Sequence, residues 1–268
     1  MIYDKSRYIA PYSYLINKDI REYDLEKANI SILRENNLIS DEFYNKMYNA
    51  NRDIREYTIG CLRRDNKEIE EGYQLGILEA RKRFFEINEI DDEIVLYIDN
   101  DSITIISDLL YPIHIQEKIS NYLNFRLKKQ YTSFYRLYTI DFLYYNNNIV
   151  EQYRLKNVRE DILRKDHQQY FLDILLSLFY SAQTSNILDT IKMIQNIYDQ
   201  YTKREMNYNY YREFNQQNQF KVIQTPYYIY YSDIWKEEDK NILDISYNAD
   251  LLIQLYKIYM NEYINTAS

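Results

Sequence analysis

Residues 94–106 form an apolar segment, Ile-Val-Leu-Tyr-Ile-Asp-Asn-Asp-Ser-Ile-Thr-Ile-Ile, that is interrupted once, by two aspartates. Apolar and β-branched runs are typical of strands, whereas aspartate is depleted there, so the interruption predicts a turn or a metal site between two strands. Asp99 and Asp101 are two residues apart, and in an extended chain their side chains leave the same face. Both carboxylates could then bind one divalent cation, because such ions prefer oxygen ligands.

Another aspartate lies far upstream, where a strand-like segment passes into a helix-like one. Asp24 precedes a Leu-Glu-Lys-Ala sequence, which is typical of a helix start. The segment around Asp24 and residues 97–102 together resemble two motifs of the palm domain of family B DNA polymerases. The first motif keeps only Ser31 and Ile32 of its usual run, and the second departs from its usual form at Asn100, where threonine is common.

Two further segments resemble motifs of the same family, in the same order along the chain. Residues 52–60 begin with a cation and end with glycine, as the fingers motif does, although other residues stand between. Downstream, a Lys-Lys-Gln-Tyr sequence resembles the element that contacts the primer–template duplex in that family; its matching residues are Lys128, Lys129 and Tyr131. The resemblance spans residues 24–131 and implies a miniature, divergent, phage-type core of palm and fingers.

The resemblance implies template-dependent nucleotidyl transfer that uses two divalent metals, Mg²⁺ or Mn²⁺. Asp24 and Asp101 would be the principal ligands, and Asp99 a secondary ligand or an electrostatic support. Arg52 and Arg55 would bind the incoming triphosphate, since guanidinium groups suit phosphate oxygens. Grouping carboxylates without metal is unfavourable, so we expect raised pKa values among them.

The resemblance also has consequences for substrates and partners. Asn29 stands where the family places a sugar-gate tyrosine, which implies relaxed discrimination against ribonucleotides. The implied partners are a nucleic acid primer–template, nucleoside triphosphates and a protein that supplies missing domains. We expect no proofreading exonuclease, because too few residues precede Asp24.

Other interpretations of the same residues stay open. Asp99 and Asp101 are also typical of a solvated hairpin turn, and Asp24 of a helix N-cap. The arginines and lysines are also typical of solvated surfaces. The chain is then a catalytically inactive palm-derived module, or an unrelated helical phage protein, that binds a protein or a nucleic acid.

The composition narrows the class of protein. A single cysteine cannot form an internal disulfide, and with only His114 and His167 as histidines there is no set of ligands for structural zinc. These features fit a reducing cytoplasm, which is the host cytoplasm for a viral protein. Three glycines, three prolines and 33 tyrosines indicate an AT-rich coding sequence, as in a virus of a low-GC bacterium, more than a tyrosine-specific function.

Charge and hydropathy bear on the expected partners. The net charge of −8 opposes nucleic-acid binding, which depends on cations that neutralise phosphates, although arginines and lysines are concentrated at 52–83 and 126–136. The first residues are charged and lack the apolar core of a signal peptide. No run of about 18 apolar residues is present, so we expect no membrane partner.

We expect an α+β fold, with a small antiparallel palm-like sheet and helices followed by a mostly helical C-terminal domain. Residues 1–146 would be the palm-like core, with abbreviated helical fingers at about 40–86, and residues 147–268 a thumb-like domain. Hydrophobic periodicity predicts the remaining elements. These are a short helix after Asp24, one long helix from Ser40 to about Arg64, a helix at 67–86, strands at 94–98 and 103–107, a helical or mixed piece at 115–122, strands at 131–145, helices at 158–181, 184–206 and 247–264, and a loop or short strand at 216–235.

Overall fold

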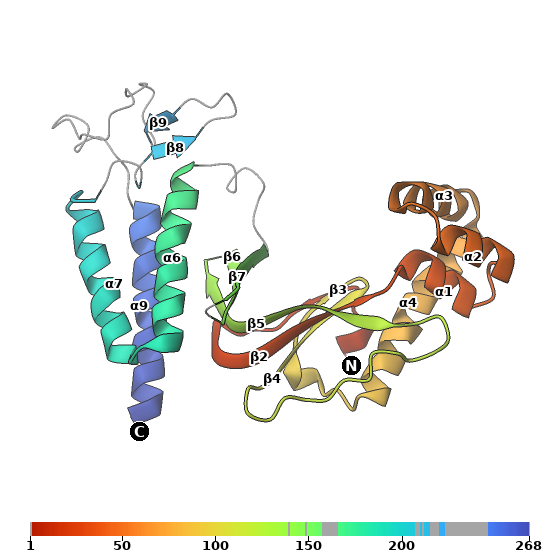
Figure 1. Cartoon of the computed structure of the whole chain (residues 1–268), viewed down its shortest axis with the longest axis horizontal. Helices are drawn as coiled ribbons and strands as arrows, with labels where there is room; N and C mark the ends of the chain where they lie inside the picture. Colours follow the sequence, from red (N-terminus) through yellow and green to blue (C-terminus); the bar gives the residue numbers. More distant parts are fainter. Residues whose placement is uncertain are drawn as a thin grey trace. The chain divides into compact units, whose positions relative to one another are not determined.

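The computed structural model describes residues 2–138, 140–147, 149–156, 166–206, 210, 212–214, 220–222 and 246–267 (Figure 1). Within this part the chain is α+β, as the sequence predicts. Contacts divide it into two compact units, Met1–Tyr12 with Lys18–Tyr131, and Ser13–Asn17 with Thr132–Ser268. Strands β2 (Tyr14–Leu25) and β5 (Phe125–Leu137) contribute residues to both units.

The first unit contains most of the sheet and four helices. Its other elements are η1 (Ile2–Asp4), β1 (Arg7–Ile9), α1 (Ala28–Glu35), α2 (Asp41–Tyr48), α3 (Arg52–Asp65), α4 (Lys67–Ile87), η2 (Asp92–Ile94), β3 (Val95–Asp99) and β4 (Ser102–Asp108). The strand order here is β1-β3-β4-β2-β5. Strands β3 and β4 form the predicted hairpin around Asp99 and Asp101, and β2 pairs with β4 in antiparallel register from Lys18↔Asp108 to Asp24↔Ser102.

The first unit owes its core to α4, which packs on the sheet. Phe84 is fully buried and lies between Tyr23 of β2 and Phe125 of β5, with ring centroids 5.7 and 4.4 Å away. Gly76 allows α4 to approach α1 closely, because a Cβ atom there would collide with Ile32 and Asn36. The aromatic cluster thus packs α4 against β2, the strand that carries Asp24, and against β5.

The expected long helix from Ser40 to Arg64 is wrong, because the chain forms two helices there. Ser40 is the predicted N-cap, and its hydroxyl accepts a hydrogen bond from the Phe43 amide at 3.2 Å. Helix α2 then ends at Tyr48, and the side chain of Asn51 caps a new helix by accepting from the Asp53 amide at 2.9 Å. Asparagine favours such caps over helix interiors, which explains the break.

The helical or mixed piece expected at 115–122 is also wrong. The structure has irregular chain there, with one isolated bridge between Lys118 and Asn124. The Ser120 hydroxyl accepts hydrogen bonds from the amides of Tyr122 and Leu123, at 3.2 and 3.0 Å, and so forms a local turn. Serine competes with the helix backbone in this way. Of the apolar residues in this segment only Ile115 is buried.

In its described residues, the second unit combines a small part of the sheet with three helices. Its elements are β6 (Ile140–Asn146), β7 (Glu151–Lys156), α6 (Asp166–Thr184), α7 (Ile187–Thr202), β8 (Arg212–Phe214), β9 (Phe220–Val222) and α9 (Ser246–Ala267), with strand order β5-β6-β7. The expected start of the first helix at 158 and most of the stretch 216–235 lie outside the described residues. The side-chain amide oxygen of Asn147 accepts from the amides of Ile149 and Val150, so the predicted turn joins β6 to β7.

Tyrosines build much of the second core. The ring of Tyr135 stacks on Phe179, with centroids 4.2 Å apart, and its hydroxyl accepts a hydrogen bond from Tyr259 at 2.8 Å. Burial raises the pKa of Tyr135 to about 12. These tyrosines are therefore packing residues, which fits the interpretation that their number reflects an AT-rich coding sequence.

No described helix is both long and apolar enough to span a membrane.

Substitution of Phe84 by alanine tests the core of the first unit. We expect Phe84→Ala to lower the free energy of unfolding by about 3–5 kcal/mol, because a large aromatic ring is removed from a closed site. Urea unfolding followed by circular dichroism measures the loss. The matched control on the same helix is Leu75→Ala, since Leu75 is 68% exposed and its removal should cost under about 0.5 kcal/mol. Equal losses in the two variants would contradict this packing.

Candidate functional site

Asp24 and Asp101 lie near each other where β2 ends beside the β3–β4 turn. Asp24 is next to last in β2, lies opposite Ser102 of β4, and has a side chain that is only 18% exposed. Asp101 lies in the turn itself, and its carbonyl accepts a hydrogen bond from the Leu25 amide at 3.0 Å. The end of β2 is thereby bonded to the turn. The sequence expectation that Asp24 and Asp101 come together is consistent with this arrangement.

The electrostatics of Asp101 support the same conclusion. Burial raises the pKa of the Asp101 carboxyl, and repulsion from Asp24 and, more weakly, Asp99 adds to the increase. The ammonium group of Lys128 acts in the opposite direction. The expected rise in pKa is therefore present at Asp101. Its causes show that Asp101 lies within electrostatic range of both other carboxylates, while Asp99 itself is exposed at the end of β3.

The turn that carries Asp101 is held from two sides. Asn100 has a left-handed backbone, with φ 53°, a conformation that asparagine adopts more readily than most residues. Its amide donates to the carbonyl of Ser6 at 2.8 Å, and its carbonyl accepts from Nη1 of Arg81 at 2.7 Å. The asparagine that departs from the family motif thus suits the backbone of a tight hairpin.

The side chains available for the metal site predicted from the sequence are few. Among the residues that the structure describes, no group of three or more Asp, Glu, His or Cys side chains is placed to hold a metal ion. A pair of carboxylates is nevertheless what Mg²⁺ commonly takes from a protein, with waters and substrate phosphates as its other ligands. The Lys128 ammonium lies 3.3 Å from Oδ1 of Asp24. The Asp24 carboxylate is therefore paired with a cationic side chain of the same protein.

A network that the sequence did not reveal lies beside the carboxylates. Arg63, near the end of α3, binds Glu70 through two nitrogens, at 2.6 and 3.0 Å, and donates from Nη1 to Oδ1 of Asn29 at 2.9 Å. Its guanidinium carbon also lies 3.6 Å from the centre of the Tyr73 ring. The amide nitrogen of Asn29 donates to Glu56 at 2.6 Å. Asn29 is thus held by both ends of its side-chain amide.

Tyr73 connects this network to the acidic pair. Burial raises the pKa of Tyr73; the cation of Arg63 lowers it, and repulsion from Asp101 is among the causes that raise it further. Tyr73 is therefore within electrostatic range of both Arg63 and Asp101. The signal in the sequence was ambiguous, because Arg63 is one of two successive arginines and nothing in the pattern distinguishes the inward one.

A group of cations gathers beside the N-terminus of α1. Lys27 precedes this helix in a left-handed conformation, with φ 46°, and no side chain caps the helix. Its ammonium donates to the Tyr48 carbonyl at 2.8 Å and lies 3.2 Å from the centre of that ring. Burial lowers the pKa of Lys27, and repulsion from Arg55 and Arg126 lowers it further. The positive end of the helix dipole has the same sign as these cations.

Arg55 is the most enclosed member of this group. Its side chain belongs to a residue only 8% exposed, and Nη1 donates to the Ala50 carbonyl at 3.4 Å. Nε is buried without a hydrogen-bond partner among the described residues and lies 3.8 Å from the Glu56 carboxylate. The other acid in the group, Glu26, accepts hydrogen bonds from Tyr48 and Asn124. The cations are therefore only partly neutralised, an arrangement that favours an anionic ligand.

The other site residues that the sequence predicts differ in their exposure to solvent. Arg52 is exposed at the first position of α3. Lys129 is partly exposed on β5, and Lys128 is paired with Asp24. Tyr131 is fully buried, so its ring lies in the core and not on the surface. Lysine contacts with a duplex stay a prediction.

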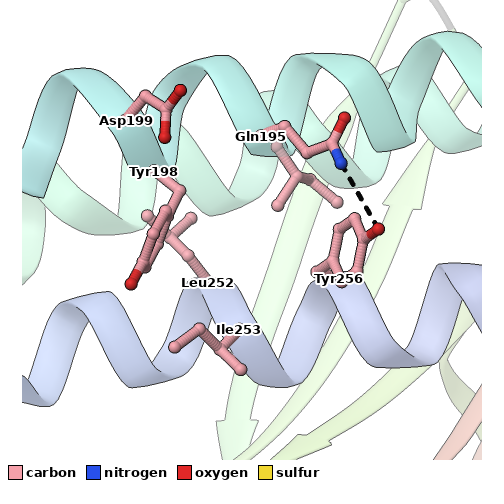
Figure 2. A pocket seen from close by; sticks show the side chains of 7 residues that line it. Gln195, Tyr198, Asp199, Leu252, Ile253 and Tyr256 are labelled. Carbon is pink, nitrogen blue, oxygen red and sulfur yellow. Dashed lines mark hydrogen bonds between the residues drawn. The ribbon is translucent and has the colours of Figure 1, made fainter.

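A separate groove lies in the second unit, between α7 and α9 (Figure 2). It has a volume of about 460 Å³ and is lined by Ile194, Gln195, Tyr198, Asp199, Leu252, Ile253 and Tyr256. The amide of Gln195 donates to the Tyr256 hydroxyl at 3.3 Å across it, as Figure 2 shows. Its lining contains one carboxylate, that of Asp199, and no cation.

The raised pKa of Asp101 has a measurable effect on stability. The folded chain binds the Asp101 proton more tightly than the unfolded chain does, so the ionised carboxylate destabilises the fold once the pH exceeds its ordinary range. In metal-free buffer we expect Asp101→Asn to melt at a higher temperature than wild type at pH 7, and the difference to disappear below about pH 3.5. Thermal unfolding between pH 3 and 8 checks this.

The control for this comparison is Asp65→Asn. Asp65 is an exposed aspartate that pairs with Arg64 at the end of α3. We expect no gain in melting temperature from this substitution at any pH. A wild-type chain that is more stable than Asp101→Asn at pH 7 without metal would show that Asp101 is not under repulsion.

Comparison with known proteins places the chain in a family. The sequence profile of the Bacteriophage PBS1 gene 130 protein family matches residues 1–261. The match spans both units and includes the acidic pair, the Arg63 network and the cations beside α1. No curated protein matches the chain. Since nearly the whole sequence is matched, the chain belongs to the Bacteriophage PBS1 gene 130 protein family.

Proposed function

We propose that this phage protein catalyses template-dependent nucleotidyl transfer at Asp24 and Asp101. The observation that supports the proposal is the proximity of Asp24 and Asp101, which are 77 residues apart in sequence: the amide of Leu25, next to Asp24, donates to the Asp101 carbonyl, and Asp24 lies within electrostatic range of the Asp101 carboxyl. Strand order supports the resemblance to a family B polymerase palm, because β2 and the hairpin carry the two matching motifs and are neighbours in the sheet. The fold alone would not define the chemistry.

The acidic pair supplies the metal ligands in this proposal. Asp24 and Asp101 would hold Mg²⁺ or Mn²⁺, and Asp99, exposed nearby, would support the charge. When bound, such an ion stabilises the charge that develops on the phosphoryl oxygens and orients the attacking hydroxyl. The raised pKa of Asp101 fits this role, since a cation relieves the repulsion between the carboxylates. Lys128 would have to leave Asp24 when the ion binds.

The cations beside α1 supply the phosphate contacts. Lys27 is three residues from Asp24 in sequence, and Arg55 and Arg126 lie within electrostatic range of Lys27. These cations and the helix N-terminus would bind the triphosphate of the incoming nucleotide, with Arg52 as an outer contact. The partial burial of Arg55 would strengthen its interaction with an anion, because the local dielectric is low.

The remaining contacts concern nucleic acid and a second protein. Lys128 and Lys129 on β5 would bind the backbone of a primer–template duplex, and this binding should weaken steeply with salt. The net charge of −8 opposes duplex binding by most of the surface. Because little of the surface favours duplex binding, we expect a protein partner that supplies additional basic surface and the missing domains.

A second function is favoured by one observation. The ion pair between Lys128 and Asp24, at 3.3 Å, neutralises a carboxylate without any metal. A palm-derived module that has lost catalysis and binds a protein or a nucleic acid would keep such a pair. The two functions differ in whether a divalent cation displaces Lys128.

Primer extension distinguishes the two functions. The full-length chain is incubated with a labelled primer–template, nucleoside triphosphates and Mg²⁺ or Mn²⁺. We expect extension by wild type and by Asp65→Asn, and a loss of at least about 100-fold in Asp101→Asn, because one principal ligand is removed. No extension by a folded wild-type chain, together with no metal-dependent increase in its melting temperature, would favour the inactive module.

Asn29 generates a prediction about the sugar. The structure holds this side chain in place through Arg63 and Glu56, and an amide here is smaller than the tyrosine of the family motif. We expect wild type to prefer deoxyribonucleotides over ribonucleotides by less than about 100-fold, the level that a pocket reaches without a specific clash. Single-nucleotide incorporation with matched triphosphates measures the ratio. Stronger rejection of ribonucleotides would contradict a role for Asn29 at the sugar.

A further inference from the structure

Arg81 is a buried cation whose position is not explained by packing. It lies on α4 and is 1% exposed, which makes it the largest fully buried side chain among the described residues. Nη1 makes one short hydrogen bond, to the carbonyl of Asn100. Nε and Nη2 are buried without a hydrogen-bond partner among the described residues. Burial of a guanidinium group with so few partners lowers the stability of the fold. Its presence therefore points to a role other than packing.

The charges around Arg81 do not form a structural ion pair. Burial lowers the pKa of Arg81, and attraction from Asp4 and Tyr73 opposes that effect without outweighing it. Asp4 is exposed at the end of η1, and none of the Arg81 side-chain nitrogens makes a hydrogen bond to it. An apolar side chain would fill the same space without the desolvation cost of the cation.

The single bond that Arg81 makes reaches the backbone of the acidic turn. The Asn100 carbonyl belongs to the peptide that leads into Asp101, so a donor on this oxygen restricts the rotation of that peptide. Ser6 holds the amide of Asn100, and the Leu25 amide holds the carbonyl of Asp101. Together these bonds fix Asp101 against the strand that carries Asp24.

We propose that Arg81 is a positioning residue, which holds the Asn100 carbonyl and so presents the Asp101 carboxylate to a divalent cation shared with Asp24. This inference rests on the proposed metal site. Groups that orient the ligands of a metal commonly change its affinity by 10-fold to 100-fold when they are removed. Arg81 would act in this way from beneath the turn, without contact with the metal or the substrate.

The test measures Mn²⁺ affinity of the full chain by electron paramagnetic resonance of the free ion, with folding checked by circular dichroism. The variants are Arg81→Met, which fills the space without a donor, and Arg81→Lys, which keeps one. We expect Arg81→Met to fold and to bind Mn²⁺ about 10-fold to 100-fold more weakly than wild type, with Arg81→Lys between the two. The control is Arg83→Lys, on the same helix, where Arg83 pairs at the surface with Glu35 and Glu79.

The outcomes separate this inference from the proposed function. Weaker Mn²⁺ binding in a folded Arg81→Met chain, with Arg83→Lys unchanged, supports the positioning role. A loss of stability with Mn²⁺ affinity unchanged would show a purely structural residue and overturn the inference, as would the failure of both Arg81 variants to fold. No Mn²⁺ binding by wild type would overturn the metal site itself, and the inference with it.

Discussion

The antiparallel pairing of β2 with β4 is the interaction on which the candidate site depends. Its register sets Asp24 opposite Ser102. Because side chains alternate between the two faces of a strand, a slip of one residue would turn Asp24 to the other face and separate it from the hairpin. The bond from Leu25 to Asp101 continues this pairing into the turn. The proximity of Asp24 and Asp101 is therefore a consequence of sheet register, and α4 packs on β2 and β5 through Phe84.

Charge is distributed unevenly around this sheet. The chain is acidic overall, yet Lys27, Arg55 and Arg126 gather beside the uncapped start of α1. Repulsion among carboxylates, and among cations, is costly without ligands where the groups are desolvated, as Asp101 and Lys27 are. A divalent cation on the acids and a phosphate on the cations would relieve both kinds of repulsion. We take this complementarity as support for the proposed phosphoryl chemistry.

The sequence predicted the elements whose signals are local. The hairpin at Asp99 and Asp101 followed from an apolar run with a polar interruption, and the start of α2 from the capping pattern at Ser40. The break before Asn51 was missed because an asparagine cap inside a long amphipathic pattern looks like a surface residue. Arg63 and Arg81 were missed for another reason. An arginine on a helix is usually solvated, and only tertiary contacts show which one is turned inward.

The direct test of this account is a crystal structure of the chain soaked with Mn²⁺, with the ion located by anomalous scattering. We expect a peak within roughly 2.0–2.3 Å of carboxylate oxygens of both Asp24 and Asp101, with the Lys128 ammonium displaced from Asp24. Mn²⁺ bound elsewhere, or an ordered site in which Lys128 still pairs with Asp24 at saturating metal, would contradict it.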